Sequence, residues 1–434
     1  MSFSNGTSSQ CHQKGRSVHT RHSRGSRDLS RLLARLHGLR IRRLGVRIPL
    51  SSVVFAEVPG VSKSNQQAIN HSKHCTRVAS IGENHYSSLE AMTRERDEQF
   101  MCAALKEAKK ALGQTSPNPA VGAALVIDNQ IVAKGHHREA GHSHAEIECL
   151  RDFGAPVPPR AILYITLEPC STAGRTAPCT DAIISARVKN VVIGATDLNP
   201  RHSGRGMIEL RNAGVTVREG ILAEECTRLN EAFNKWIVTG QPFVIAKCGM
   251  SVDGRLTRPP SESRWITGRD ARRHAHQLRA RVDAVLVGAE TVRADNPRLT
   301  VRGVRRARQP WRVVLTRSGQ LPRQAHVLSD KFAARTLIYK RKSLASVLKD
   351  LGKRGITSVL IEGGGEVLGQ GLDRRLIDKV QIYLGPIMTG GSVIAFPGKG
   401  TNETANALRL RDLEYQRIEQ TVRITGYPEL VRRE

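Results

Sequence analysis

Three side chains of the kind that bind zinc constrain this chain more than any other feature: His144, Cys170 and Cys179. One imidazole and two thiolates suit zinc, and three protein ligands leave the fourth tetrahedral position to water, as in catalytic rather than structural sites. A fold that uses them must bring separate turns of the backbone to one point. We therefore expect one zinc ion per chain, bound by these three residues.

The sequence around these residues predicts how the backbone reaches the metal. Residues 161–168 are apolar and rich in β-branched side chains, which predicts a buried strand that ends just before Cys170. Residues 180–187 predict a helix, and we expect another helix to begin at His144. Both helices would point their positive N-terminal ends at the metal, where they favour thiolate. The alternative, ordinary buried cysteines and a surface histidine, suits any one of these residues alone but not all of them together.

Glu146 follows His144 by two residues and has a separate role in this interpretation. In zinc deaminases a glutamate at this position is not a ligand, and it carries the proton from water to the departing ammonia. That signature ends in P-C-x-x-C, whereas eight residues separate Cys170 from Cys179 here, so the residue types agree better than the spacing. We expect Glu146 to be the catalytic residue of a hydrolytic deaminase.

Length and composition are typical of a soluble globular protein of two or three domains. The chain has 434 residues, of which 39% are hydrophobic, and no apolar run is long enough to span a bilayer. Its eight cysteines show no repeating spacing, which indicates free thiols in a reducing compartment rather than a secreted disulfide scaffold. We expect a cytoplasmic protein with no membrane partner.

A formal net charge of +29 raises the question of a nucleic-acid partner, because clustered Lys and Arg bind phosphates. Residues 1–91 carry fourteen Lys and Arg against four acidic residues, so a net +10 of the +29 lies there. Aromatic residues make up only 4%, so stacking platforms for single strands are scarce. A small phosphorylated substrate explains a basic site equally well, and we expect no nucleic-acid partner. The competing hypothesis is a nucleic-acid base deaminase with an RNA-binding appendage.

Residues 1–95 differ in composition from the remainder of the chain. They are rich in Ser, Arg, His and Gly, and they lack the periodicity of a buried helix or strand. Three interpretations stay open: a disordered arm, an organellar transit peptide, or residues upstream of the true start of translation. Met92 begins the first strongly helical segment, which favours the third interpretation, a start of translation at that residue. A transit peptide would place the protein in an organelle.

The remaining sequence alternates helical and strand patterns in two successive domains. Residues 96–240 contain the metal-binding residues, and their pattern also predicts a hairpin-like pair of strands over 121–132, around Asp128-Asn129, and a helix through Trp236. Residues 241–434 begin with Gln241-Pro242 and a strand over 243–247. Helices that alternate with strands indicate α/β domains whose sheets are covered on both faces. We expect a zinc-dependent deaminase domain followed by a second α/β domain.

Two loops of the second domain could bind phosphate. Gly363, Gly364 and Gly365 connect a predicted strand to a predicted helix, where free backbone amides would face an anion. Residues 295–302 form a polar segment that ends in Arg302, whose guanidinium can bind a phosphate through two hydrogen bonds. Taken alone, the glycines are also typical of a plain turn, and residues 295–302 of a solvated turn.

Over residues 96–434 the sequence resembles the bifunctional deaminase-reductases of riboflavin biosynthesis. The resemblance rests on short motifs in the family's order. In the first domain these are Ser116-Pro-Asn-Pro-Ala-Val-Gly122, Gly135-His136, Ala140-Gly141, His144-Ala-Glu146, Thr166-Leu-Glu-Pro-Cys-Ser171, Gly174-Arg-Thr176 and Gly204-Arg-Gly206. In the second they are Lys247, Ser251-Val-Asp-Gly254, Ser263-Arg-Trp-Ile-Thr267, Asp295-Asn-Pro-Arg-Leu-Thr-Val-Arg302 and Glu362-Gly-Gly364.

This resemblance implies a cytidine-deaminase-like three-layer domain followed by a dihydrofolate-reductase-like α/β domain. It implies zinc-dependent removal of an amino group from a phosphoribosylated diaminopyrimidinone, and then NADPH-dependent reduction of the ribosyl moiety to ribityl. The partner would be this small phosphorylated pyrimidine, and the protein would form a homo-oligomer. An alternative of another class, a non-catalytic scaffold, disagrees with the intact His144, Glu146, Cys170 and Cys179.

The resemblance also carries individual roles to matching positions. For the deaminase substrate it implies contacts from Asn118 and Arg175. For the reductase substrate it implies contacts from Ser263, Arg279, Leu299, Arg302 and Glu362. For NADPH it implies contacts from Gly249, Trp265, Thr267, Thr291, Asp295, Gly364 and Gly365.

The chain departs from the family pattern near the metal. Thr172 replaces a usual histidine and Ala177 a usual proline, and Leu198 and His202-Ser203 also differ. We expect these differences to weaken substrate contact by about one hydrogen bond, roughly 1 kcal/mol, and to leave zinc binding intact.

Overall fold

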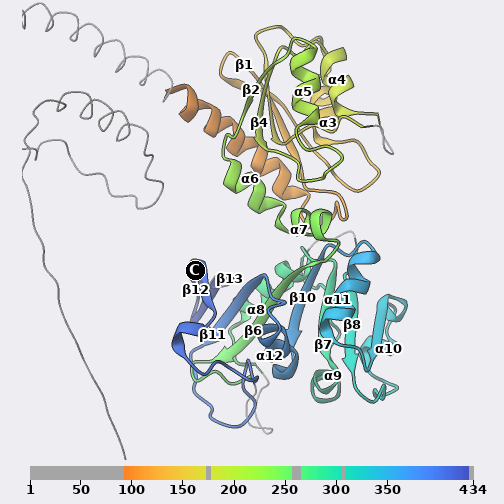
Figure 1. The fold of residues 1–434 in the computed structure, drawn as a ribbon, viewed down its shortest axis with the longest axis vertical. Coiled ribbons are helices and arrows are strands. Elements are labelled where there is room, and N and C mark those ends of the chain that lie inside the picture. Colours follow the sequence, from red (N-terminus) through yellow and green to blue (C-terminus); the bar gives the residue numbers. More distant parts are fainter. Residues whose placement is uncertain (1–91, 173–176, 257–264, 305–307, 430–434) are drawn as a thin grey trace, which may run out of the picture. The chain divides into compact units, whose positions relative to one another are not determined.

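The computed structural model describes residues 92–172, 177–256, 265–304 and 308–429 (Figure 1). Residues 1–91, Arg175 and Ser263 lie outside these ranges, so the expectations for them stay predictions. The described residues form one sheet between 122 and 219 and a second sheet between 243 and 429.

The first sheet has five strands in the order β2-β1-β3-β4-β5. Strand β1 runs antiparallel to β2 and β3, whereas β3, β4 and β5 are parallel. Asp128 and Asn129 turn the chain between β1 and β2 with left-handed φ angles of 50° and 62°, as tight hairpins require, and this confirms the predicted hairpin. The strands are β1 (Gly122–Ile127), β2 (Gln130–His136), β3 (Ile162–Leu167), β4 (Asn190–Ala195) and β5 (Thr216–Glu219).

Helices cover both faces of this sheet. The helix over residues 92–110 packs on β1 at Gly122, where a Cβ would lie 2.1 Å from the helix backbone. Helix α3 packs on β2 at Gly135, where a Cβ would lie 2.3 Å from its backbone. Gly135 is opposite Ala123, the neighbour of Gly122, so the two glycines point to opposite faces. The helices after residue 110 are α3 (Ala145–Phe153), α4 (Cys179–Ser185), α5 (Arg205–Asn212), α6 (Ala223–Leu229) and α7 (Glu231–Thr239).

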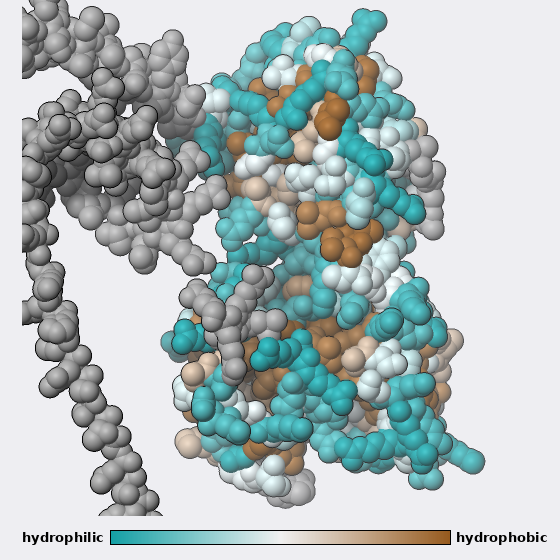
Figure 2. All heavy atoms as spheres, viewed as in Figure 1, coloured by the Kyte–Doolittle hydropathy of each residue, from teal (hydrophilic) through white to brown (hydrophobic). Residues whose placement is uncertain are grey.

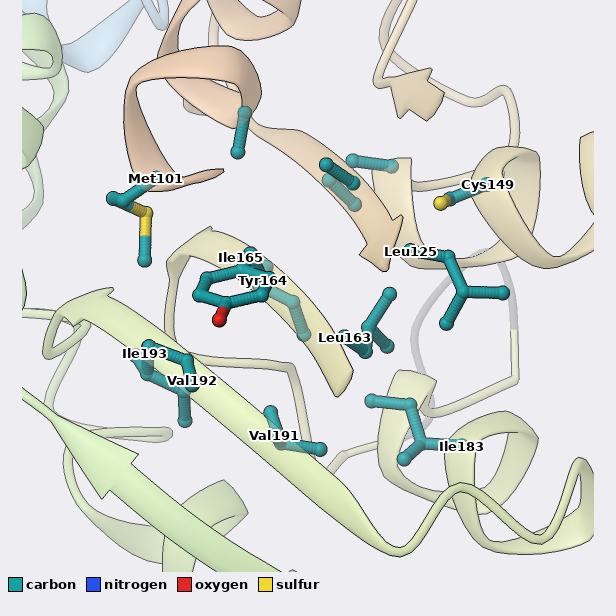
Figure 3. Close-up of a cluster of buried hydrophobic side chains, with 14 of the residues drawn as sticks. Met101, Leu125, Cys149, Leu163, Tyr164, Ile165, Ile183, Val191, Val192 and Ile193 are labelled. Carbon is teal, nitrogen blue, oxygen red and sulfur yellow. The ribbon is translucent and has the colours of Figure 1, made fainter. Parts of the chain in front are cut away.

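The interior of this domain is apolar and closed to solvent. Leu163, Tyr164 and Ile165 of β3 and Ile193 of β4 have no exposed surface, and Figure 3 shows them among buried side chains from neighbouring elements. The Tyr164 hydroxyl donates a hydrogen bond of 2.7 Å to Asp97, so this buried polar atom is satisfied. The core therefore fixes β3, and with it the metal-binding segment that follows.

The second sheet has eight strands in the order β12-β13-β11-β6-β10-β7-β8-β9. The six strands from β11 to β9 run parallel, and β13 and β12 extend the sheet antiparallel beyond β11. The strands are β6 (Phe243–Ser251), β7 (Ala284–Gly288), β8 (Trp311–Thr316), β9 (Thr336–Lys340), β10 (Ser358–Gly363), β11 (Lys379–Gly385), β12 (Arg409–Ile418) and β13 (Thr421–Glu429).

The carboxyl ends of the parallel strands lie at one edge of this sheet, where ligands bind in open α/β sheets. Helix α12 follows β10 at that edge after Gly364, whose φ angle is 58°. The α-helices of this domain are α8 (Arg269–Arg279), α9 (Ala289–Asp295), α10 (His326–Ser329), α11 (Leu344–Lys353) and α12 (Gly365–Asp373).

The prediction of one continuous helix through Trp236 is wrong. The helix expected to end near Trp236 is divided into α6 and α7 at Asn230, which is 4% exposed. The Asn230 side chain accepts a hydrogen bond from the Ala120 amide at 2.8 Å and donates one to the Ala120 carbonyl at 3.0 Å. These tertiary bonds hold the asparagine at the break, and they also fix the loop that contains Asn118.

Hydrophilic side chains spread over the visible face of the described residues, with hydrophobic ones in smaller separate patches (Figure 2). All six described cysteines are free thiols, as expected. Among the described residues, no helix is both long and apolar enough to cross a membrane.

Candidate active sites

His144, Cys170 and Cys179 come together as the sequence predicts. Their ligand atoms, one from each residue, all lie within 4.8 Å of one another. His144 Nδ1 lies 3.2 Å from Cys179 Sγ and 3.5 Å from Cys170 Sγ. His144 caps α3, Cys170 follows β3 and Cys179 begins α4, so a buried strand and two helix starts position the set. This donor set suits a tetrahedral zinc ion with an open fourth position.

The two thiols share a hydrogen bond that separates their pKa values. The hydrogen bond from Cys179 is the main cause that lowers the pKa of Cys170, to about 4, against the effect of burial. The same bond, together with burial, raises the pKa of Cys179. A thiolate is therefore favoured at Cys170, and a divalent cation would favour a second one at Cys179.

Glu146 lies in the first turn of α3 and is 3% exposed. Its Oε2 has no hydrogen-bond partner among the described residues. Burial is the main cause that raises the pKa of Glu146, to about 7. A buried, unpartnered oxygen needs an explanation, and a water molecule beside the zinc site would supply one. The carboxyl group can then gain or lose a proton near neutral pH.

His137 is a site residue that the sequence interpretation missed. Its ring centroid lies 5.1 Å from that of His144, and its Nδ1 lies 3.0 Å from the Ser143 carbonyl oxygen. A carbonyl can only accept, so Nδ1 donates, and Nε2 is left to accept from Asn118 Nδ2 at 3.2 Å. Burial lowers the pKa of His137, which agrees with a neutral ring. The amide oxygen of Asn118 is thus left as an acceptor beside the metal site.

Glu168, at the end of β3, is a second missed residue. Its carboxylate accepts hydrogen bonds from the amides of Asp197, Gly204 and Gly206 at 3.2, 2.9 and 3.0 Å. These bonds hold the loop after β4 against the segment that leads to Cys170. Its only sequence signal was its place before the Pro-Cys pair, which does not indicate three backbone partners.

Thr172 and His202, two residues that differ from the family pattern, lie close together in the structure. Thr172 Oγ1 and His202 Nδ1 lie 3.4 Å apart, beside the segment that contains Cys170. An imidazole is therefore present near position 172, although residue 172 itself is a threonine. The effect of these departures, and of Ala177 and Leu198, on substrate binding stays a prediction.

In the second domain, Arg279 and Glu362 form a buried ion pair. Arg279 Nη2 donates to Glu362 Oε2 at 2.7 Å, and Nε donates to Oε1. Lys247 Nζ lies 3.8 Å from the same carboxylate. Burial alone would raise the pKa of Glu362, but the Arg279 and Lys247 cations outweigh it and lower the pKa to about 2. The carboxylate is therefore ionised at every physiological pH.

A cavity of about 400 Å³ lies beside this pair. Seven of the residues that line it are basic: Lys247, Arg269, Arg272, Arg273, His276, Arg279 and Arg302. Burial, followed by the Arg279 and Arg302 charges, lowers the pKa of His276 to about 4. A cavity lined by fixed cations and a neutral imidazole suits an anionic ligand. Trp265, expected at NADPH, also lines it, with the Arg272 guanidinium 4.6 Å from its ring centroid.

Four of the residues expected at NADPH form two neighbouring pairs. A Cβ on Gly249 would lie 3.3 Å from Thr267 Cγ2, and one on Gly364 would lie 3.4 Å from Thr291 Oγ1. Each glycine therefore lies directly against the threonine of its pair, and a contact of these residues with NADPH stays a prediction. Gly365 has another constraint, because a Cβ there would lie 2.3 Å from the Ile394 carbonyl oxygen. Asp295 is the last residue of α9.

The interpretation of residues 295–302 as a solvated turn holds for only part of the segment, because Asp295, Asn296, Arg298 and Arg302 are exposed whereas the three residues between Arg298 and Arg302 are buried. Leu299, Thr300 and Val301 are 2%, 6% and 6% exposed. Leu299 has a left-handed φ of 52°, which is rare for a branched side chain. Residues 299–301 are therefore a packed part of the loop, which ends at Arg302 on the cavity wall.

Comparison with known proteins agrees with this pair of sites. Residues 94–195 match the cytidine and deoxycytidylate deaminase zinc-binding region, and residues 242–424 match the RibD C-terminal domain. The riboflavin biosynthesis protein RibD of Aquifex aeolicus is 38% identical over 344 residues, which cover 74% of this chain and 96% of that protein. The chain belongs to the RibD family. The RibD of Escherichia coli is 37% identical, over 68% of this chain and 89% of that protein.

Solved structures of RibD proteins share the fold. The Acinetobacter baumannii RibD, form 1, has a TM-score of 0.71 and 35% identity, and it covers 77% of this chain and 99% of that one. A deaminase/reductase from Thermotoga maritima has a TM-score of 0.72 and 34% identity over 77% and 99% of the two chains. The predicted fold class is confirmed. This RibD protein is a bifunctional deaminase and reductase of riboflavin biosynthesis, with a zinc-binding deaminase domain and an NADPH-dependent reductase domain.

Proposed function

We propose that the first domain hydrolyses an amino group of 2,5-diamino-6-(5-phosphoribosylamino)pyrimidin-4(3H)-one. The second domain then reduces the ribosyl side chain of 5-amino-6-(5-phosphoribosylamino)uracil to ribityl. The Thermotoga maritima protein of known structure is a diaminohydroxyphosphoribosylaminopyrimidine deaminase and 5-amino-6-(5-phosphoribosylamino)uracil reductase. The observation that carries the proposal for this chain is the buried, unpartnered Glu146 Oε2 beside three converging zinc ligands.

In the deaminase site, His144, Cys170 and Cys179 would hold one zinc ion, which would supply a Lewis acid for the activation of water. Glu146 takes the proton of the attacking water and delivers it to the departing amino group, because its pKa of about 7 suits both directions of transfer. Asn118 offers its amide oxygen to a donor group of the pyrimidine, in the orientation that His137 imposes. Arg175 contacts the same substrate.

In the reductase site, the hydride comes from NADPH, so the protein's task is to orient the sugar and exclude water. Arg279 and Glu362 form a fixed pair that presents hydrogen-bonding groups to the ribosyl moiety. Arg302, on the wall of the cationic cavity, binds the substrate phosphate. Ser263 and Leu299 complete the substrate contacts.

Gly249, Trp265, Thr267, Thr291, Asp295, Gly364 and Gly365 contact NADPH in this proposal. Support comes from the pairing of Gly249 with Thr267 and of Gly364 with Thr291, which leaves backbone uncovered by side chains. The start of α12 after Gly364 would place backbone amides at the cofactor phosphates.

We also infer a homo-oligomer in a reducing compartment, the cytoplasm, with no nucleic-acid partner. The six free thiols support the compartment, and the cationic cavity accounts for part of the positive charge through a small phosphorylated ligand. Light scattering of the purified protein measures the oligomeric state, and a monomer at working concentration would contradict that part.

Metal removal tests the deaminase proposal. Chelation should stop ammonia release and leave NADPH oxidation on the deaminated substrate unchanged, and added zinc should restore the first activity. Metal analysis should find one zinc per chain, and none in a protein with Cys170→Ser and Cys179→Ser. Stoichiometric zinc in that double variant would refute the ligand assignment.

A further inference from the structure

We propose that Arg312 of β8 is a positioning residue for reduction: it fixes the backbone of residues 298–302 and thereby aims Arg302 at the substrate phosphate. The proposal rests on the function proposed above for Arg302. It adds a residue that does not face the cavity and that neither the sequence interpretation nor the family resemblance singled out.

Arg312 is 1% exposed, which is unusual for an arginine, and it lies in β8, the strand next to the edge strand β9. Four acceptors satisfy its guanidinium. Nε donates to Thr336 Oγ1 at 3.0 Å, and Nη2 donates to the Val327 carbonyl at 3.0 Å. Nη1 donates both to Asp330 Oδ2 at 2.8 Å and to the Arg298 carbonyl at 3.2 Å. One side chain thus connects β9, the segment around α10 and the start of the 298–302 segment.

Stability alone does not explain this arrangement. Burying a charged pair is expensive in desolvation, and well-packed apolar side chains of similar volume are often as stable or more so. The neighbouring Val313 and Val314 of β8 are fully buried and apolar, so this part of the sheet accepts apolar residues. An apolar residue at position 312, however, could not donate a hydrogen bond to the Arg298 carbonyl.

Leu299, which follows the Arg298 carbonyl, has a strained backbone conformation. Leu299 has its left-handed φ of 52° although it is 2% exposed and carries a branched side chain. Such a conformation persists where the surroundings fix it on both sides. Arg312 holds the Arg298 carbonyl before it, and Arg279 Nη1 donates to the Thr300 carbonyl at 3.1 Å after it.

The fixed backbone continues to Arg302. The Arg302 amide donates to His276 Nδ1 at 3.3 Å, and Arg302 Nη1 donates to Thr300 Oγ1 at 3.1 Å. Releasing the Arg298 carbonyl would let Leu299 relax to a right-handed conformation, which turns the following backbone and moves Arg302 relative to the Arg279–Glu362 pair. A shift of about 1 Å in a positioning group is enough to reduce a rate strongly.

Arg312→Lys tests the proposal, because lysine keeps the charge but lacks the planar fork that reaches four acceptors. The matched control is Arg354→Lys, whose side chain is 54% exposed at the end of α11. NADPH oxidation is measured with 5-amino-6-(5-phosphoribosylamino)uracil and with the same compound lacking its phosphate. The ratio of the two kcat/KM values reports how well Arg302 engages the phosphate, and cofactor fluorescence gives the NADPH Kd separately.

We expect the wild type and Arg354→Lys to prefer the phosphorylated compound, and Arg312→Lys to lose that preference by about tenfold or more through a raised KM, as for loss of one charge-assisted contact. The NADPH Kd should stay unchanged. A purely structural role would lower both kcat/KM values together, so an unchanged ratio overturns the proposal. A wild type that oxidises NADPH with neither compound would instead overturn the proposed function.

A second variant keeps the test decisive if Arg312→Lys does not fold. Asp330→Asn removes the anionic partner of Arg312 at a position that is 22% exposed. It should reduce the phosphate preference in the same direction and by a smaller factor. A folded Asp330→Asn protein with the wild-type ratio would count against Arg312 as a positioning residue.

Discussion

Arg279 and Glu362 lie 83 positions apart in the chain, yet two nitrogens of the guanidinium contact the two oxygens of the carboxylate in the buried wall of the second site. A single helix, α8, and a single strand, β10, bring them together. Because both charges are buried, each depends on the other for its stability. The pair therefore connects the fold of the reductase domain to its proposed substrate contacts.

Glu362→Gln should destabilise the protein by about 3–5 kcal/mol at pH 7, because it leaves Arg279 buried without its counter-charge. The folded pKa of Glu362, about 2, lies below its ordinary 4.5. The pair thus stabilises the fold above about pH 4.5, and this contribution is lost as the pH falls towards 2. Calorimetry should show that the difference in Tm between variant and wild type narrows below that pH.

The matched control is Glu366→Gln on α12. The ion pair of Glu366 with Arg317 has side chains 66% and 85% exposed, so its loss should change stability by no more than about 1 kcal/mol. Equal destabilisation by both changes, or a Glu362→Gln effect that does not depend on pH, would contradict the buried-pair account.

Glu146→Gln should reduce deamination by about 10²–10⁴-fold, because an amide keeps the shape of the side chain but cannot carry the proton. Zinc content and NADPH oxidation on the deaminated substrate should stay at wild-type levels. Glu148→Gln, two residues along the same helix, is the control and should keep deamination. Deamination by Glu146→Gln within about tenfold of wild type would refute the proton-transfer role.

Arg302→Ala should lower reductase kcat/KM by about 10- to 100-fold, as expected for loss of a charge-assisted contact of about 1.5–3 kcal/mol. Deamination should barely change, and Arg354→Ala should change neither activity. The nucleic-acid hypothesis predicts instead that Arg302→Ala weakens RNA retention and its salt dependence. Unchanged reduction together with weakened RNA binding would overturn the small-molecule account.

A protein that lacks residues 1–91 should keep both activities. The sequence of that segment has no core periodicity, and the matches to the two family regions begin at residue 94. Expression of the shortened chain, followed by both assays, checks this. Insoluble or inactive protein would show that the segment contributes to the fold.

Much of the deaminase site could be predicted because its signals are local. The metal ligands stand at the ends of strongly patterned elements, and the turn at Asp128-Asn129 has residues that tolerate left-handed φ angles. The role of His137 could not be predicted, since it depends on Asn118 and Ser143, which the sequence does not show to be in contact with it.

Where the structure differs from the elements predicted from the sequence, contacts between residues far apart in the chain explain most of the differences. Asn230 divides one predicted helix because it bonds the distant Ala120 backbone. Strand β12 was not predicted because almost all its side chains are exposed, so it lacks an alternating apolar pattern. Residues 295–302 resembled a solvated turn because their polar composition hides the burial of Leu299, which Arg312 and Arg279 impose from other strands and helices.

The central claim is that one chain performs two consecutive reactions, and a single assay of the purified wild-type protein tests it most directly. The protein is given the phosphoribosylated diaminopyrimidinone, zinc and NADPH, and ammonia and NADPH are followed together. The account predicts ammonia release first, then oxidation of an equal amount of NADPH. NADPH oxidation without prior ammonia release, or ammonia release with no subsequent oxidation, would contradict it.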